Sequence, residues 1–109
     1  MTSHTFNLHH KLHYSVQYLA TGNGSLKDRL SEVFVSYLLS LKCDSNNSEV
    51  EKLIQEAQDL ATSIKDPHEK FGHLYYTMMM SHWTLKRKIA DTIFRAYELT
   101  VEELRDSAR

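Results

Sequence analysis

Residues Tyr75–Trp83 read YYTMMMSHW, three consecutive methionines among aromatic side chains. On an α-helix, three consecutive residues point in three different directions, so a single buried face cannot accept all of them. The surrounding sequence has helical periodicity and predicts one long helix over residues 67–98. This helix carries two apolar stripes, and what covers each stripe determines both the fold and the function that we expect.

The first apolar stripe of residues 67–98 is the predicted core face. At 100° per residue it contains Phe71, Leu74, Tyr75, Met78, His82, Leu85, Ile89, Ile93 and Ala96. The second stripe is centred roughly 110° away and contains Tyr76, Met79, Trp83, Ala90, Phe94 and Tyr97. The remaining arc is expected to be polar and holds Lys70, Thr77, Thr84, Lys88 and Arg95. Met80 points toward this polar boundary.

The second stripe has two interpretations. It is part of the core if the other helices wrap the long helix from two sides, since a large apolar arc usually belongs to a core. It is a binding surface if part of it is exposed, because Met, Trp, Tyr and Arg are enriched at binding hot spots. The candidate partner-binding residues are Tyr76, Met79, Trp83, Lys86 and Arg87. A homodimer would cover the same stripe with a second copy.

Helix-start signals divide the chain into segments. Three pairs have the spacing of a capping box: Ser25 with Asp28, Ser48 with Glu51, and Thr100 with Glu103. The sequence DPHE places Asp66 as a cap and Pro67 at the first helical position. The sequences TGNGS and DSNNS are turns. We therefore predict helices near residues 6–20, 26–42, 49–65, 67–98 and 101–107.

The composition supports an all-α fold. Three glycines and one proline in 109 residues are too few for a turn-rich β domain. Short connections favour antiparallel neighbours. The sequence therefore predicts a single helical domain over residues 1–109, an antiparallel four-helix bundle with a long fourth helix and a short C-terminal fifth helix.

Charge and hydropathy narrow the functional classes. A net charge of −1, from 13 basic and 14 acidic residues, argues against a strongly basic nucleic-acid-binding protein. No segment has the run of about 18 apolar residues that a membrane span needs, and the first residues do not resemble a signal peptide. Cys43 is the only cysteine, so an intramolecular disulfide is excluded. We expect a cytoplasmic protein without membrane contact.

The histidines of the first helix are the candidates for metal chemistry. His9 and His13 are four residues apart, and His10 and His13 are three apart, which suits facing side chains on a helix. Zinc usually takes three or four protein ligands, and a third could come only through folding from His4, His68, His73 or His82. We expect an exposed or interfacial histidine cluster and assign no metal site and no cofactor.

No catalytic signature appears in the sequence, so we do not predict an enzyme. His82 interrupts the core stripe and is expected to be buried and hydrogen-bonded. Cys43 has no activating base beside it in the sequence and is expected to be a small, partly buried residue.

The sequence predicts a small helical protein that acts by binding another protein, as a regulator, an inhibitor or an adaptor. The alternative is a nucleic-acid-associated protein that uses the basic residues of Lys86–Arg95 with Lys27 and Arg29. A second alternative is a metal-binding protein that uses the histidines of its first helix.

Overall fold

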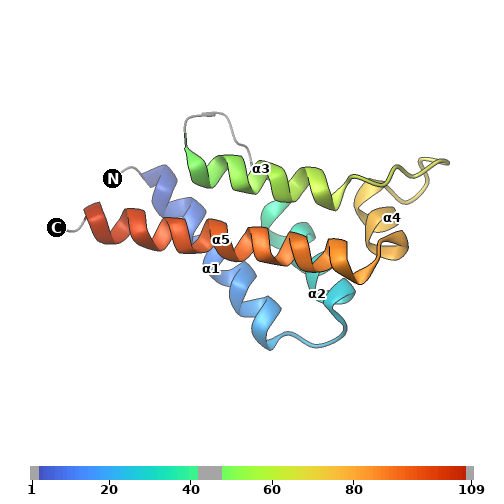
Figure 1. Cartoon of the computed structure of the whole chain (residues 1–109), viewed down its shortest axis with the longest axis horizontal. Helices are drawn as coiled ribbons and strands as arrows, with labels where there is room; N and C mark the ends of the chain where they lie inside the picture. The colour runs from blue at the N-terminus through green and yellow to red at the C-terminus, as the bar shows by residue number, and fades with distance from the viewer. Residues whose placement is uncertain (1–2, 42–47, 108–109) are drawn as a thin grey trace.

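The computed structural model describes residues 3–41 and 48–107, and every regular element within these ranges is a helix (Figure 1). The elements are α1 (Ser3–Thr21), α2 (Leu26–Val33), the π-helical turn η1 (Phe34–Leu38), α3 (Glu49–Ala61), α4 (His73–Met80) and α5 (Trp83–Ser107). The predicted all-α class is confirmed. The more specific antiparallel four-helix bundle is not confirmed. Cys43 lies outside the described residues.

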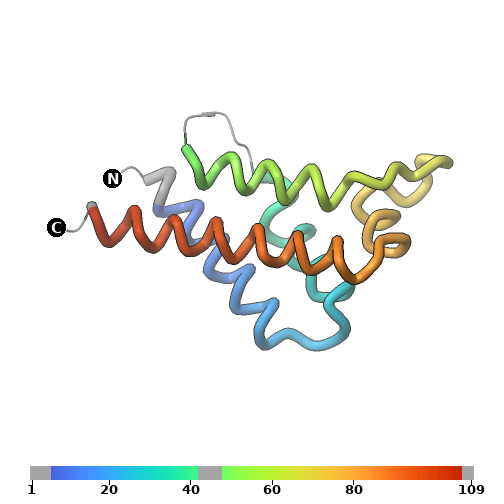
Figure 2. The backbone as a smooth tube through the Cα atoms, viewed as in Figure 1, coloured from blue at the N-terminus to red at the C-terminus, as the bar shows by residue number. Residues whose placement is uncertain are grey.

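Helix α5 organises the molecule. It has 25 residues and therefore a length of about 37 Å, in a molecule that measures 50 × 29 × 21 Å. Helix α3 lies beside α5 and runs in the opposite direction, while α1 crosses α5 obliquely (Figure 1). Figure 2 shows that the α3–α4 loop and the short helix α4 lie at one end of the α3–α5 pair, next to α2. This end of the molecule contains the candidate site.

Two of the predicted helix starts are correct because their hydrogen bonds are local. The Ser25 hydroxyl accepts a hydrogen bond from the backbone N–H of Asp28, and the Asp28 carboxylate accepts one from the N–H of Ser25. The Ser48 hydroxyl likewise accepts from the N–H of Glu51. The turn before α2 requires a glycine at Gly24, whose φ is 94°.

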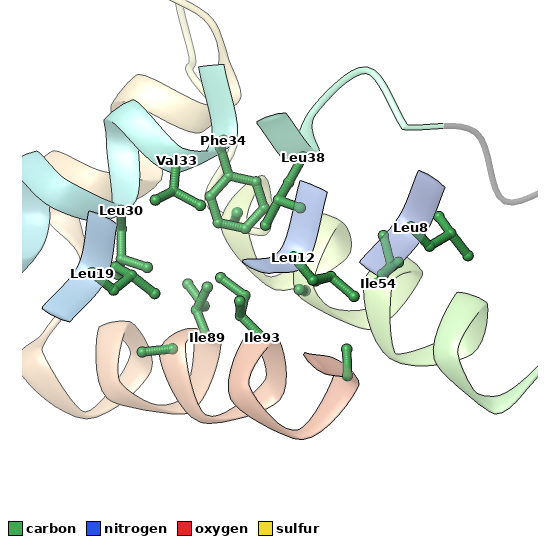
Figure 3. Close-up of a cluster of buried hydrophobic side chains, with 14 of the residues drawn as sticks. Leu8, Leu12, Leu19, Leu30, Val33, Phe34, Leu38, Ile54, Ile89 and Ile93 are labelled. Atoms are coloured by element: carbon green, nitrogen blue, oxygen red, sulfur yellow. The ribbon is translucent and has the colours of Figure 1, made fainter. Parts of the chain in front are cut away.

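The core is a single cluster of aliphatic side chains around one phenylalanine (Figure 3). Phe34, from the start of η1, is completely buried and lies over Ile89 and Ile93 of α5. Helix α1 contributes Leu12 and α3 contributes Ile54 to the same cluster. Burial of each such side chain is worth about 1.5–3 kcal/mol. The inward faces of α1, α2, α3 and α5 are therefore covered by one another within the chain.

The predicted single helix over residues 67–98 is wrong, because the chain turns between α4 and α5. Ser81 has an extended conformation with ψ of 151°, and its N–H makes the last α4 hydrogen bond to the carbonyl of Thr77. The Thr77 hydroxyl, placed on the polar arc by periodicity, is buried and bonds both the N–H and the carbonyl of Ile64. Lys86 Nζ donates to the Ser81 carbonyl at 2.6 Å. These contacts hold the corner between the two helices.

The predicted helix start at Pro67 is also wrong, since α4 begins six residues later. The buried carboxylate of Asp66 caps a loop instead of a helix. Its two oxygens accept hydrogen bonds from four backbone N–H groups, those of His68, Lys70, Phe71 and Gly72. Gly72 then has a φ of 89°, which no α-helical residue adopts.

The predicted separate helix over 101–107 is wrong as well, because α5 continues without a break to Ser107. The Thr100 hydroxyl donates to the carbonyl of Tyr97 within the helix instead of capping a new one. Nothing with the backbone properties of glycine or proline interrupts this stretch.

Among the described helices, none is both long enough and apolar enough to cross a membrane.

Candidate functional site

The turn between α4 and α5 changes which side chains of this region face outward. Phe71 and Tyr75, predicted for the core, are 62% and 49% exposed. Together with the half-exposed Met79 they are spaced four residues apart, so they form one row from the end of the loop along α4. The rings of Phe71 and Tyr75 are in contact, with centroids 5.2 Å apart. His82, also predicted to be buried, is exposed at the corner before α5.

A second exposed apolar row lies on η1. Val35 is 69% exposed and Leu39 is 44% exposed. The π-helical turn is marked by the hydrogen bond from the N–H of Leu39 to the carbonyl of Phe34, five residues earlier, at 2.8 Å. Phe34 and Leu38 of the same turn are buried in the core. Because the inward positions are already filled from η1, Val35 and Leu39 remain on the outside.

These two rows border one groove, which we call the apolar groove and define by Val35, Leu39, Phe71, Tyr75 and Met79. It consists of two adjoining hollows of about 420 Å³ and about 290 Å³. The larger hollow is bordered by Val35, Leu39, Phe71 and Tyr75, and the smaller one by Val35, Tyr75 and Met79. Helix α2, which leads directly into η1, packs against α4. The chain thus presents a concave apolar surface.

The five residues predicted to bind a partner occupy different environments. Met79 lines the apolar groove. Trp83 is 60% exposed on the first turn of α5, where the guanidinium of Arg87 lies 5.2 Å from its ring centroid. Tyr76 is half-buried, and Lys86 is directed to the Ser81 carbonyl. The structure therefore places Met79 in the groove and a Trp83–Arg87 pair on the adjoining helix, and it directs the Lys86 ammonium group to the corner.

Val35 and Leu39 were missed from the sequence. The segment Val33–Leu41 reads VFVSYLLSL, which contains more apolar residues than one helical face can bury. That excess was the available signal. The π-helical turn that fixes which of them point outward is a deviation from the 3.6-residue period, so periodicity alone could not assign them.

The charged side chains that line the apolar groove are of both signs, Lys27 with Asp28 and Glu32. Residues 62–88, which include the α3–α4 loop, α4 and the start of α5, have five basic and two acidic residues, a net charge of +3 in a chain of net charge −1. The ammonium group of Lys70 lies 5.3 Å from the ring centroid of Phe71. Burial, and then the charge of Lys27, lower the pKa of Lys86. On the opposite wall, the carboxylates of Asp28 and Glu32 accept hydrogen bonds from Ser25 and Ser36 respectively.

The histidine cluster connects α1 to the C-terminal half of α5. His9 stacks on Tyr97 with ring centroids 5.4 Å apart, and His13 Nδ1 lies 3.4 Å from the Tyr97 hydroxyl. Since the Thr100 hydroxyl already donates its proton to a carbonyl, it accepts a hydrogen bond from His9 Nδ1 at 3.1 Å. Burial, followed by the neighbouring His13 and His10, lowers the pKa of His9. The imidazoles of His9 and His13 therefore contact α5, whereas the His10 ring packs against Tyr14 of α1.

The described residues contain no group of three or more His, Cys, Asp or Glu side chains that could hold a metal ion. Two basic residues assigned to the nucleic-acid alternative have partners inside the chain. Arg29 donates to the carbonyl of Leu19 near the end of α1, and Lys86 donates to the carbonyl of Ser81. Both side chains therefore cap helix ends.

Comparisons of the chain with protein-family models, with curated proteins and with solved structures find no match.

Proposed function

We propose that the protein acts by binding another protein through the apolar groove, as a regulator, an inhibitor or an adaptor in the cytoplasm. The observation that carries the proposal is the pair of exposed apolar rows, one on each wall of a single concavity. Soluble monomers rarely expose contiguous apolar patches larger than a few hundred Å² without a functional reason. Binding, rather than catalysis, is the activity that such a surface supports.

The side chains of the apolar groove suit a protein partner. Phe71 and Tyr75 provide large contact areas with few rotatable bonds, and Met79 adapts its shape to what it contacts. Trp83, with Arg87 stacked on it, extends this surface onto α5. Trp, Tyr and Arg are the residue types that most often contribute strongly to binding energy. In the proposed binding surface, the groove is the centre, and the residues that were predicted from the sequence lie at its border.

The proposal is tested by affinity purification of the tagged protein from its native host, with quantification of the proteins that co-purify. We compare the natural chain with Phe71→Glu in the groove and with Phe6→Glu on α1. Phe6 is 56% exposed, close to the exposure of Phe71, and lies outside the groove, so it is a matched control. A charged side chain within an apolar contact is expected to reduce binding at least tenfold.

The expected result is a partner protein that is recovered with the natural chain and with Phe6→Glu but lost with Phe71→Glu. Circular dichroism and thermal unfolding of both variants verify that each is folded. Equal recovery of every co-purifying protein with the two variants would contradict the proposal.

The nucleic-acid alternative receives less support, because Arg29 and Lys86 are directed to carbonyl groups within the chain. Lys27, Lys88 and Arg95 are exposed cations. Phosphate contacts by so few cations would give weak binding that decreases steeply with salt. Titration with duplex DNA and with single-stranded RNA at low salt tests this alternative directly.

A further inference from the structure

We infer that two copies of this chain associate through the outward face of α5, with the two α5 helices antiparallel. This contact lies outside the apolar groove, to which α5 contributes no residue. The inference therefore concerns a second surface and does not rest on the proposed function.

An apolar stripe runs along the outward face of α5, whereas α1 and α3 pack on its other sides (Figure 1). The stripe consists of Trp83, Ala90, Phe94 and Val101, which fall within about 40° of one another at 100° per residue. Trp83 is 60% exposed, and Phe94 and Val101 are each 37% exposed, so the core leaves much of these three side chains uncovered. Steps of seven and four residues form the narrow seam along which two helices pair.

The charge of α5 is divided between its two halves. Residues 83–95 contain four basic residues and one acidic residue, a net charge of +3. Residues 96–107 contain four acidic residues and one basic residue, a net charge of −3. An antiparallel second copy places each basic half against an acidic half, whereas a parallel copy places like charges together. The helix is therefore complementary to its own reversed copy.

A two-fold axis at Phe94 brings the stripe and the charges into register. The two Phe94 rings then meet at the centre of the contact, and Arg87 is level with Val101 of the second copy. Arg87, Glu98 and Glu102 are exposed and lie on the same flank of the stripe. A two-fold axis perpendicular to the helices brings this flank against the same flank of the second copy. Arg87 therefore lies between Glu98 and Glu102 of the second copy.

A second copy is the occupant that this charge pattern selects, because every copy carries the complement of the face. The stripe contains only three large exposed apolar side chains, so we expect a weak dimer that forms at micromolar or higher concentrations. Since its two halves attract each other by charge, added salt should weaken it. An interface held by apolar contact alone would not show this dependence.

The test is sedimentation equilibrium of the full chain over a range of micromolar concentrations, at low and at high salt. Phe94→Asp in the stripe is matched with Phe6→Asp on α1, because both phenylalanines are exposed. Val35→Asp in the apolar groove shows whether the groove contributes to association. Circular dichroism verifies that each variant is folded.

Two double charge reversals test the pairing of the halves. Arg87→Glu with Arg95→Glu makes both halves of α5 acidic, and Glu98→Lys with Glu102→Lys makes both halves basic. These four positions are exposed, so the reversals decide the question even if Phe94→Asp impairs folding. Lys52→Glu with Lys65→Glu, at exposed positions outside α5, is the control for the change in net charge.

The expected result is a dimer of the natural chain whose dissociation constant rises with salt, and rises at least tenfold with Phe94→Asp and with each double reversal on α5. The variants Phe6→Asp, Val35→Asp and Lys52→Glu with Lys65→Glu leave it within twofold. An equal mixture of the two α5 reversals forms a heterodimer, although neither associates alone.

A natural chain that stays monomeric at every concentration would overturn the inference. A dimer that strengthens with salt would show that like charges are in contact, and a mixture of the two reversals that does not associate would show that the halves do not pair. A dimer lost with Val35→Asp but kept with Phe94→Asp would move the contact to the apolar groove. Each of these results excludes the antiparallel α5 contact.

Discussion

Thr77 is the residue on which the corner between α4 and α5 depends. Its hydroxyl group is buried and makes two hydrogen bonds to the backbone of Ile64, one as acceptor at 3.0 Å and one as donor at 3.1 Å. Both Ile64 groups lie where the chain leaves α3, after the helix hydrogen bonds have ended. One side chain thus satisfies backbone groups of a segment thirteen residues away and fixes the position of α4.

Replacement of Thr77 by valine keeps the shape of the side chain and removes the hydroxyl. Both backbone groups of Ile64 then lack their partner, which we expect to lower the free energy of unfolding by about 2 kcal/mol. Thr84→Val, at an exposed position on α5, is the matched control and should change stability by less than about 0.5 kcal/mol. Urea unfolding followed by circular dichroism measures both values. Equal effects of the two substitutions would show that the hydroxyl of Thr77 does not hold the corner.

Asp66 makes the stability of the α3–α4 loop depend on pH in the acid range. The N–H of Phe71, with those of His68, Gly72 and Lys70, holds the pKa of the Asp66 carboxyl below its ordinary value. At neutral pH the carboxylate is ionised in the folded and unfolded chains, and its contribution to stability is complete. As the pH falls through the ordinary aspartate pKa of about 3.9, the unfolded chain is protonated first, so this contribution is lost.

We therefore expect Asp66→Asn to reduce the stability at neutral pH and to flatten its decrease between about pH 5 and pH 3. Asp91→Asn, at an exposed position on α5, is the control and should keep the slope of the natural chain. The measurement is the free energy of unfolding by urea at each pH. An unchanged slope in Asp66→Asn would assign the acid sensitivity to other carboxyl groups.

At the scale of the elements, the local capping signals at Ser25 and Ser48 were predicted correctly, whereas those at Asp66 and Thr100 do not start helices. Contacts between distant segments were not predicted. The cap at Ser25 requires only residues three positions apart, so the sequence identifies it. The end of α4 depends on Thr77 meeting Ile64, and no pattern within the helix reveals that contact. The periodicity also placed Phe71 and Tyr75 on a core face, because the prediction treated residues 67–98 as one continuous helix with one axis. The sequence showed that residues 67–98 hold more apolar side chains than one helical face can bury. Which of them are exposed could be seen only in the folded structure.

The contact between α1 and α5 has a pH dependence of its own. His9 is held between Tyr97 and Thr100 of α5, with His10 and His13 as the neighbouring titratable groups on α1. Since the pKa of His9 is lowered in the folded chain, the unfolded chain binds a proton first as the pH falls. Stability is therefore unaffected by this group well above about pH 6.5 and decreases as the pH falls through that value.

Replacement of His9 by glutamine should remove this component of the pH dependence between about pH 7.5 and pH 5.5. His68→Gln, on the exposed α3–α4 loop, should leave it in place. Thermal unfolding at closely spaced pH values, together with a proton NMR titration of the imidazole resonances, measures both effects. A His9 resonance that titrates at or above the ordinary histidine pKa would contradict this account.

At the scale of the whole molecule, the described residues form a buried core and, at one end, an exposed apolar surface. Leu12 of α1, Ile54 of α3 and Ile93 of α5 belong to one buried core cluster, so these helix faces pack against one another. The end formed by η1 and α4 instead has apolar side chains on its surface. Packing within the described chain covers the first set and leaves the second exposed. This asymmetry is the reason for placing a partner at that end.

Site-specific photo-crosslinking in living cells tests this placement most directly, because it reports contact instead of loss of contact. A photoreactive phenylalanine analogue is incorporated at Val35 in the apolar groove and, in a separate sample, at Phe6 on α1 as the control. We predict that Val35 gives a crosslink to another protein and that Phe6 does not. Crosslinks of equal yield from both positions, or crosslinks from Val35 only to a second copy of this chain, would contradict the claim that the groove binds a different protein.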